Sequence, residues 1–239
     1  MLVTSVLLNH LTVGGIPGDL QSMGLSGVVY GVLGNDPALI GSLGGAVLEA
    51  PYKAPPKAPV LYVKPRNTLA VSGAATALEA ADEGFEVAVN VGMVIGQTAC
   101  RVTAERALGH VSAFVAVADL SIPHEAFYRP SLRFKARDGS CLIGSALTPA
   151  SAVANPDDLV VRVLVDGQLA QVTSTAARVR SAAQLLQDVT EFMTLRPGDI
   201  LLLGASHRAP LVRAGQRFVA EVDGLAPVSG EIVNAGGAK

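Results

Sequence analysis

The chain has 239 residues and a formal net charge of −2, and half of its residues are apolar while 16% are charged. This composition excludes a disordered chain, because disorder requires low hydrophobicity and high net charge. A charge so close to zero, without any run of Lys or Arg, also excludes a protein that coats nucleic acid. Small molecules or other proteins are therefore the expected partners.

The N-terminal segment 1–15 is apolar but has no basic start, and Asn9-His10 interrupts it. These features favour a strand over a signal peptide. No run of about eighteen apolar residues occurs, so we expect no membrane span and a cytoplasmic location. Cys100 and Cys141 are too few for a disulfide framework or a thiolate metal site, and we expect both to be buried, reduced thiols.

In the first half of the chain we expect a strand-rich segment over residues 1–50, followed by an extended connector. Three prolines in Ala54-Pro55-Pro56-Lys57-Ala58-Pro59 keep this connector out of a central strand. Val60–Val63 and the Val-rich run Phe85–Ile95 predict strands. A short helix should begin after Thr103, whose hydroxyl can cap it, with Glu105 in the first turn.

The second half predicts more strands and one amphipathic helix. Asp166-Gly167 and Asp223-Gly224 suit tight hairpin turns, because such turns require positive φ. The helix should begin near Ser174 or Thr175 and end by Arg196, since Pro197 follows. Its apolar face consists of Ala182, Leu185, Leu186, Val189, Phe192 and Met193. The predicted strands here are Leu159–Val165, Ile200–Leu203 and Arg217–Val222, so the chain is an α+β protein, mainly β, with a main domain over residues 51–239 in one compact unit overall.

Two segments resemble a known family. Pro51–Thr68, with its Tyr52-Lys53-Ala54-Pro55-Pro56-Lys57 start, and Tyr128–Gly139, with Lys135-Ala136-Arg137-Asp138, are similar to the fumarylacetoacetate hydrolase family. Within it they resemble the N-terminal unit of the bifunctional isomerase/decarboxylases of 4-hydroxyphenylacetate (homoprotocatechuate) degradation. The resemblance implies a mixed β-roll with a few flanking helices. It also implies the decarboxylation of 5-oxopent-3-ene-1,2,5-tricarboxylate and the isomerisation of 2-hydroxyhepta-2,4-diene-1,7-dioate.

Active members of that family hold Mg²⁺ or Mn²⁺ with a Glu-x-Glu pair on one strand and an Asp on a later strand. Residues two apart on a strand point to the same face, so paired carboxylates converge on one hard cation. Counting back from Gly96, the two Glu positions fall on Ala88 and Asn90, neither of which is a carboxylate. Asp119 matches the later Asp, although it is equally a turn-forming carboxylate. We therefore expect the metal to be absent or weakly bound.

The resemblance places further residues at the site. Lys135 matches the active-site lysine, and its alternative role is a side chain that extends to solvent. Arg129 and Arg137 are candidates to clamp substrate carboxylates, with surface salt bridges as the equal alternative. Ser174 and Thr175 lie where relatives contact substrate, although helix capping also explains them.

Three further positions depart from the family or stay ambiguous. Asn35-Asp36-Pro37 lacks the His and Glu that relatives use for proton transfer, and Gly204-Ala205-Ser206 replaces a Gly-Thr-Pro turn. His124 is a possible base but is more often structural. The leading expectation is a subunit for a small carboxylated enol or oxo-acid substrate, in a homo-oligomer or with a complete homologous subunit. A non-catalytic structural partner and an acylpyruvate-type C–C hydrolase are the alternatives.

Overall fold

The computed structural model of the chain describes residues 17–124 and 132–236. The strand expected over residues 1–15 lies outside this range, as does Arg129. The strands are β1 (Val29–Leu33), β2 (Val60–Lys64), β3 (Leu69–Val71), β4 (Ala75–Leu78), β5 (Phe85–Ile95), β6 (Val111–Ser121), β7 (Cys141–Ile143), β8 (Thr148–Pro149), β9 (Val160–Val165), β10 (Gln168–Ser174), β11 (Ile200–Leu202), β12 (Leu211–Val212), β13 (Arg217–Val222) and β14 (Val228–Asn234).

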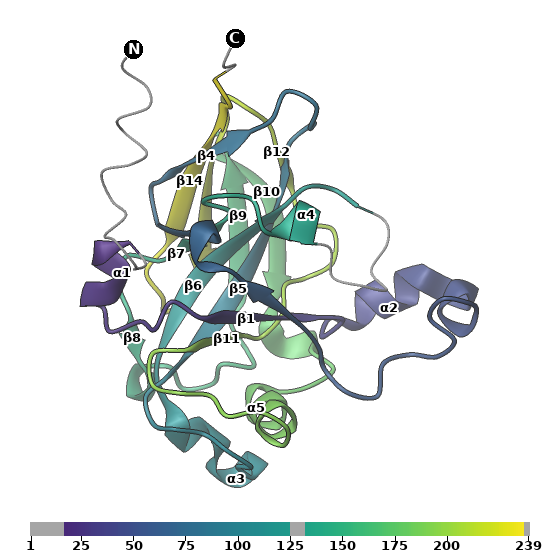
Figure 1. The fold of residues 1–239 in the computed structure, drawn as a ribbon, viewed down its shortest axis with the longest axis vertical. Helices are drawn as coiled ribbons and strands as arrows, with labels where there is room; N and C mark the ends of the chain where they lie inside the picture. Colours follow the sequence, from purple (N-terminus) through teal and green to yellow (C-terminus); the bar gives the residue numbers. More distant parts are fainter. Residues whose placement is uncertain (1–16, 125–131, 237–239) are drawn as a thin grey trace.

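Short helices join these strands. The α-helices are α1 (Gly18–Ser22), α2 (Pro37–Leu43), α3 (Ala104–Ala107), α4 (Leu132–Lys135) and α5 (Ala182–Thr190), and the 3-10 turns are η1 (Gly44–Leu48), η2 (Arg66–Thr68), η3 (Leu108–His110), η4 (Ala150–Ala152) and η5 (Thr175–Ala177). Figure 1 shows α3 beside α5 at the bottom of the view, while α2 lies on an arm that extends away from the sheets. No helix in the described ranges is both long enough and apolar enough to cross a membrane.

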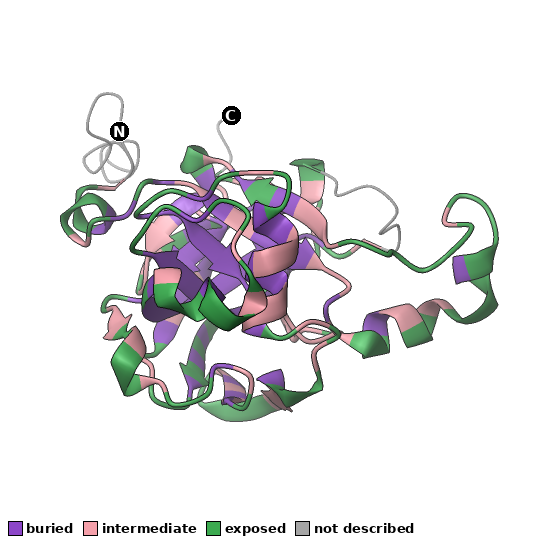
Figure 2. Cartoon of the chain, turned by 90° about the horizontal axis from the view of Figure 1, so that it is seen from below, coloured by how far each residue is buried: buried purple, intermediate pink, exposed green. Residues whose placement is uncertain are grey.

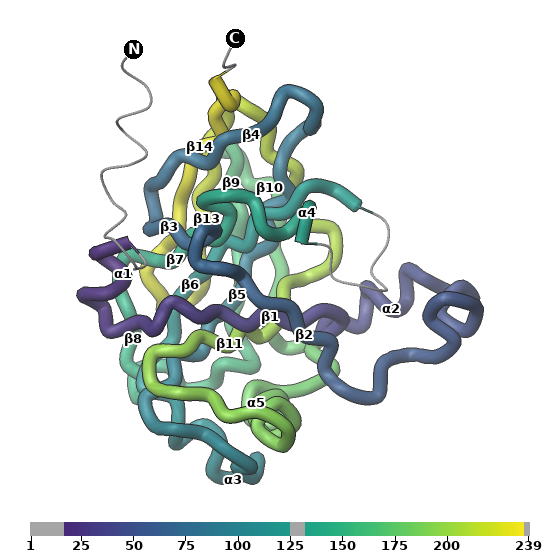
Figure 3. The backbone as a smooth tube through the Cα atoms, viewed as in Figure 1, coloured from purple at the N-terminus to yellow at the C-terminus, as the bar shows by residue number. Residues whose placement is uncertain are grey.

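Two mixed sheets form the body of the protein. The nine-stranded sheet has the order β2-β1-β11-β5-β6-β7-β3, with β12 beside β5 and β8 beside β6, and the five-stranded sheet has the order β10-β9-β13-β14-β4. Most neighbours are antiparallel, but β1–β11, β3–β7 and β4–β14 are parallel. Figure 3 follows the chain from α1 through β1 to α2 and back through β2. The mainly β, α+β fold class is confirmed.

The main core lies between the two sheets, and Figure 2 shows buried strands at the centre with partly buried helices and exposed loops around them. Alternate β5 residues such as Val87 and Val91 pack there with Phe218 of β13 and Leu186 of α5. The opposite face of β5 and β6 is divided. Its apolar end is covered by Leu20 of α1, and its other end carries the polar residues described below.

The predicted strands agree closely with the structure because alternation and β-branched residues are local signals. Phe85–Ile95 and Arg217–Val222 match to the residue, and the other three differ by one residue at one end. Asp166 (φ 48°) and Gly167 (φ 79°) both adopt positive φ between the antiparallel strands β9 and β10. Gly224 (φ 75°) does the same between β13 and β14.

The start of the long helix was wrong. Helix α5 begins at Ala182, where the side chain of Ser181 accepts a hydrogen bond from the Gln184 amide at 3.2 Å. Residues 175–177 form the separate turn η5. The apolar face is buried from Ala182 to Val189, but Phe192 lies beyond the helix and is 64% exposed.

Two smaller expectations also need correction. Helix α3 does follow Thr103, but the Thr103 hydroxyl makes no capping hydrogen bond. The Ala104 amide instead donates to Gln187 Oε1 at 2.8 Å, so α5 supplies the cap. Cys141 is buried as expected, whereas Cys100 is exposed.

Candidate functional site

Three side chains meet at Asp119, a buried residue near the end of β6. Lys64 Nζ lies 2.8 Å from Asp119 Oδ1, and Lys135 Nζ lies 3.4 Å from Oδ2. The Tyr62 hydroxyl donates a short hydrogen bond to the same Oδ2. Lys135 Nζ also sits 4.5 Å from the centre of the Tyr62 ring, a cation–π contact. We call Tyr62, Lys64, Asp119 and Lys135 the Asp119 centre.

Local strand geometry brings Tyr62 and Lys64 to this centre. Both lie on β2, two residues apart, so their side chains leave the same face of the strand. Tyr62 pairs with Gly31 of β1, and a Cβ added at Gly31 would lie 2.0 Å from the ring. Because Gly31 has no side chain, the Tyr62 ring can lie across β1.

Lys64 is surrounded by oxygen atoms. Besides its ion pair with Asp119, its ammonium group donates to the carbonyl oxygens of Leu120 (3.3 Å) and Lys135 and to Ser140 Oγ (3.1 Å). Its side chain is 0% exposed. A buried ammonium group is tolerated only when its donors are satisfied, and here they join β2 to the end of β6 and to α4.

The charges of the centre fix its protonation states. Burial opposes ionisation of Asp119, but the ammonium groups of Lys135 and Lys64 outweigh it and lower the pKa of Asp119 from 3.8 to about 2. Burial, reinforced by Asp119, raises the pKa of Tyr62 well above 10. Burial also raises the pKa of Cys141, opposite Asp119 on β7, to about 12. Tyr62 and Cys141 therefore stay protonated at neutral pH.

The strand register shows what faces Asp119. Ala88 of β5 lies directly opposite Asp119, and Asn90 lies opposite Val117. Asn90 is buried, and its Nδ2 donates to the Ala88 carbonyl at 3.3 Å while its Oδ1 has no hydrogen-bond partner. Ala88 thus offers no ligand atom and Asn90 offers only a neutral amide.

These residues do not fit a hard divalent cation, which prefers several carboxylate oxygens. Asp119 is the one carboxylate of the three positions, and two ammonium groups already lie beside it. Within the described part of the chain, no three His, Cys, Asp or Glu side chains are grouped so that they could hold a metal ion.

A cleft of about 450 Å³ lies next to the centre. It is lined by Ala81, Asp82, Glu83, Glu86, Ile122, Pro123 and His124. Glu86 is half-buried, and burial raises its pKa, although His124, Lys135 and His207 each act to lower it. Glu86 lies opposite Ser121 in the β5–β6 pair, two residues from the position where Ala88 lies opposite Asp119, so the cleft adjoins the Asp119 centre. Glu86 also lies two residues before Ala88 and on the same face of β5.

The other residues proposed from the sequence lie around this cleft or outside it. Arg137 pairs with Asp82 at 2.9 Å, at the edge of the cleft, while its buried Nε has no hydrogen-bond partner. His124 stacks on Phe134, and its Nδ1 lies 2.9 Å from the Ile122 carbonyl. Roles for Lys135 in catalysis and for Arg137 in substrate binding stay predictions.

Among the described residues, no hydrogen bond joins the hydroxyl group of Ser174 or Thr175 to the Asp119 centre. Ser174 accepts from the Ala176 amide and caps η5. The buried Thr175 hydroxyl donates to the Pro156 carbonyl and accepts from the Leu159 amide, both at 2.9 Å. These bonds hold the turn after β10.

The segment Asn35-Asp36-Pro37, where the family resemblance would imply a His and a Glu, has a structural role here. Asn35 Nδ2 donates to the carbonyls of Leu203 (2.7 Å) and Arg180 (3.0 Å), and its Oδ1 accepts from the Arg180 amide. Asp36 caps α2 by accepting from the Ala38 amide. Neither side chain is available to move a proton.

Sequence reasoning missed Tyr62, Lys64 and Glu86. The sequence does contain a signal for Tyr62 and Lys64. They are two residues apart in a strand whose other residues are aliphatic, so both side chains lie on one face of that strand. Glu86 lies within the predicted strand Phe85–Ile95, and the same alternation places it with Ala88 and Asn90.

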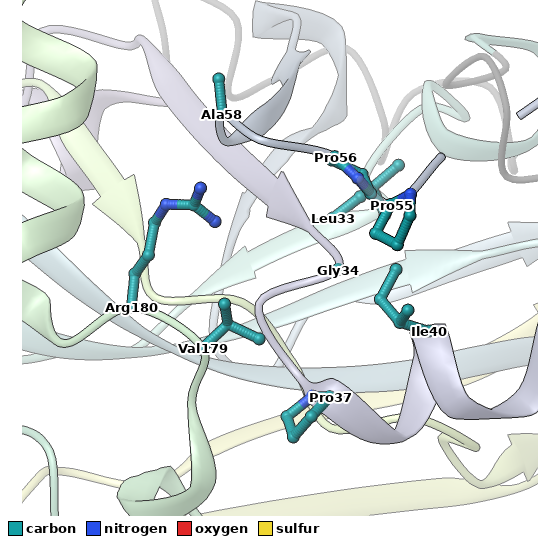
Figure 4. A pocket seen from close by; sticks show the side chains of 9 residues that line it. All are labelled: Leu33, Gly34, Pro37, Ile40, Pro55, Pro56, Ala58, Val179 and Arg180. Atoms are coloured by element: carbon teal, nitrogen blue, oxygen red, sulfur yellow. The ribbon is translucent and has the colours of Figure 1, made fainter. Parts of the chain in front are cut away.

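A second, separate pocket lies between the β1–α2 turn, the proline-rich connector and the segment before α5 (Figure 4). It has a volume of about 230 Å³ and is lined mainly by apolar side chains, among them Ile40, Pro55 and Val179, with Arg180 at one side. It does not include the Asp119 centre.

Comparisons with known proteins agree with this architecture. The chain is 33% identical over 210 residues to the 4-hydroxyphenylacetate degradation bifunctional isomerase/decarboxylase of Escherichia coli, covering 88% of the chain and 48% of that protein. It is 32% identical to Oxaloacetate tautomerase FAHD2, mitochondrial, of Oryza sativa subsp. japonica, covering 74% and 81%. The chain thus spans about half the length of the bifunctional relative.

Solved structures show the same fold. 5-Carboxymethyl-2-hydroxymuconate delta-isomerase from Mycobacterium smegmatis superposes with a TM-score of 0.74 at 23% identity, covering 89% of this chain and 81% of that one. Fumarylpyruvate hydrolase from Pseudomonas aeruginosa, solved with Mn²⁺ and pyruvate, gives 0.70 at 24% identity, covering 87% and 90%. The family described as fumarylacetoacetate (FAA) hydrolase C-terminal matches residues 28–233. The chain belongs to the fumarylacetoacetate hydrolase family.

Proposed function

We propose that this chain is a subunit of an isomerase/decarboxylase of aromatic catabolism, that it binds a small carboxylated enol or oxo acid, and that its metal site is degenerate. One observation carries the proposal. Asp119, which matches the family's ligand aspartate only by resemblance, faces Ala88 and is held by Lys64, Lys135 and Tyr62.

The charge of the centre favours an anionic ligand. Lys64 and Lys135 contribute two positive charges and Asp119 one negative charge, and all three are buried. In a buried site such a net positive charge attracts a carboxylate or an enolate and repels a free cation. Lys135, which adjoins the cleft, is the ammonium group expected to contact the ligand.

Chemistry on such a ligand needs two contributions. One is stabilisation of the developing enolate, for which a preorganised ammonium donor is suited. The other is proton transfer, typically worth about 10²–10⁴ in rate. Asn35 and Asp36 do not supply the second contribution, because their side chains hold the surrounding backbone. A complete homologous subunit is therefore the expected source of turnover.

Glu86 favours a second candidate function. It is a half-buried carboxyl in the cleft, its pKa is raised by burial, and it forms no hydrogen bond or ion pair within the described ranges. A carboxyl of this kind can carry a proton, so the alternative is a chain that tautomerises an enol acid without a metal.

The test compares the purified chain with its complex with a complete homologous subunit, following enol turnover by ultraviolet absorbance in the presence of Mg²⁺ or Mn²⁺. We expect little turnover from the chain alone and robust turnover from the complex. Lys135→Ala and the exposed control Lys57→Ala are measured alongside. Robust turnover by the chain alone that is lost in Lys135→Ala but kept in Lys57→Ala would refute the degenerate-subunit proposal, and its loss in Glu86→Gln would establish the second candidate.

The degenerate site has its own measurement. The double substitution Ala88→Glu/Asn90→Glu places two carboxylates of β5 on the sheet face that carries Asp119 of β6. Mn²⁺ binding by calorimetry should be absent in the natural chain and present in the double variant. Stoichiometric binding to the natural chain that Asp119→Ala abolishes would contradict the proposal.

A further inference from the structure

Arg178 is a buried arginine whose donors are poorly satisfied. It lies between η5 and α5, and its side chain is 4% exposed. Nη2 donates to Ser206 Oγ at 3.4 Å, Nη1 lies 3.7 Å from Asp36 Oδ2, and Nε has no hydrogen-bond partner. A guanidinium group has five N–H donors. Among the described residues, only one hydrogen bond, at a long distance, engages them.

Asp36 does not act as a full partner for Arg178. Its Oδ1 accepts from the Ala38 amide at 2.9 Å, and its Oδ2 accepts from the His207 amide at 2.7 Å. By contrast, the donors of Arg180, two residues further along the chain, are engaged in short hydrogen bonds. Its Nε donates to Asp188 at 2.7 Å and its Nη2 to the Lys57 carbonyl at 2.7 Å.

A buried charge without partners is costly, because both its hydration and its hydrogen bonds are lost. The cost has an effect on Arg178 itself, since burial lowers its pKa and Asp36 offsets this only in part. A charged group retained under these conditions points to a missing anion that the fork-shaped guanidinium can bind by paired hydrogen bonds.

We propose that Arg178 and Ser206 form a binding subsite for a carboxylate group of the ligand. The chain places this subsite beside the cleft. Ser206 accepts from Arg178, and the next residue His207 is anchored to Asp36 through its amide. The chain then runs directly to Leu211, which pairs with Glu86 of β5, and the Pro210 carbonyl accepts from the Val87 amide at 2.9 Å. Glu86 in turn lines the cleft that adjoins Lys135.

The cleft would then have cationic groups at two points, Lys135 in the Asp119 centre and Arg178 beyond His207. Two separated cations favour a ligand with two carboxylates over one with a single carboxylate. This inference deepens the proposed function and rests on it for the nature of the ligand, but the affinity of the subsite for a carboxylate can be measured without turnover.

The experiment measures binding of glutarate and of butyrate to the full chain by calorimetry, in a buffer free of carboxylate and phosphate. The variants are Arg178→Gln and the matched control Arg180→Gln, which removes the same charge from an arginine whose donors are engaged. Glutarate should bind more tightly than butyrate. Arg178→Gln should weaken glutarate binding at least ~10-fold, the loss typical of a charged hydrogen bond, and Arg180→Gln should not.

Equal effects of the two substitutions would overturn the subsite, as would a chain that binds neither acid. Thermal unfolding supplies the second readout. If Arg178 serves a ligand, Arg178→Gln should leave the melting temperature unchanged or higher in anion-free buffer and should abolish the shift that glutarate produces. If Arg178→Gln melts lower or fails to fold, the arginine has a structural role and the proposal is wrong.

These measurements distinguish failure of the Arg178 subsite from failure of the proposed function. Turnover that is indifferent to Arg178→Gln, together with unchanged glutarate affinity, refutes the subsite alone. Glutarate binding that depends on Arg178 supports the subsite even where the chain and its complex show no decarboxylase or isomerase activity.

Discussion

Replacement of Lys64 by methionine tests whether the Asp119 centre holds the fold together. Methionine has similar length and flexibility but carries no charge. The change removes the ammonium group that lies 2.8 Å from Asp119 and that donates to Leu120, Lys135 and Ser140. Asp119 would keep Lys135 and Tyr62 as partners.

The expected magnitude follows from burial. The side chains of Lys64 and Asp119 are 0% and 1% exposed, so Lys64→Met removes the shorter of the two ion pairs of a buried carboxylate and leaves the oxygen atoms that Lys64 contacts without this donor. Such a change costs about 3–5 kcal/mol of unfolding free energy. The ion pair Arg162–Asp223 is as short, at 2.7 Å, but its side chains are 39% and 49% exposed. Its loss should cost at most about 1 kcal/mol.

The assay is urea denaturation of the natural chain, of Lys64→Met and of the control Arg162→Met. A double-mutant cycle with Asp119→Asn isolates the interaction, and the double variant should be more stable than the sum of the single losses implies. If Lys64→Met costs no more than Arg162→Met, the reasoning from burial is refuted.

Three further outcomes are expected. The pKa of Asp119 is about 2 in the folded chain against an ordinary 3.8, so its ionisation stabilises the fold above about pH 4 and this stability is lost as the pH falls towards 2. Over that interval the natural chain should lose about 2 kcal/mol more than Asp119→Asn in urea titrations, and parallel curves would contradict the shift. Leu186→Ala, in the buried face of α5, should cost about 2–5 kcal/mol, whereas the exposed Leu169→Ala should be nearly neutral; equal melting temperatures would show that the core was misassigned. Gly31→Ala should cost about 1–3 kcal/mol by displacing the Tyr62 ring, while Gly41→Ala, where a Cβ meets nothing within 4 Å, serves as the control; no difference between the two would disprove the close approach.

The strands could be predicted from the sequence because their signals are local. The run Phe85–Ile95 is rich in Val and Ile, and Asp166-Gly167 provides the positive φ that a tight turn demands. Each of these signals needs only neighbouring residues. The family resemblance added the mixed arrangement of the sheets, which no local pattern contains.

The helix start was misplaced because several hydroxyls compete for the role of cap. Ser174, Thr175 and Ser181 all have the chemistry to cap a helix. The Thr175 hydroxyl is bound instead to the Pro156 carbonyl and the Leu159 amide, which lie 19 and 16 residues away in the chain. Such tertiary contacts decide between equivalent local signals and are not visible in the sequence.

The partners of Asp119 were equally difficult to predict from the sequence. Tyr62 is 57 residues from Asp119 in the chain, and Lys135 is 16 residues away. Counting along β5 correctly places Ala88 and Asn90 on the face that looks towards Asp119, because strand periodicity is local. Lys64 reaches the same carboxylate because of how β2 and β6 are arranged in the folded sheet. The periodicity within one strand does not predict this arrangement.

The presence of Asp119 beside Ala88 and Asn90 has a physical reason that does not involve a metal. Replacement of a carboxylate at residue 88 or 90 by an uncharged side chain leaves no buried charge behind, because the charge is removed together with the side chain. Loss of Asp119 would leave the ammonium groups of Lys64 and Lys135 buried and uncompensated, a situation that costs several kcal/mol. Asp119 is thus required by its lysines, and its presence alone does not indicate metal binding.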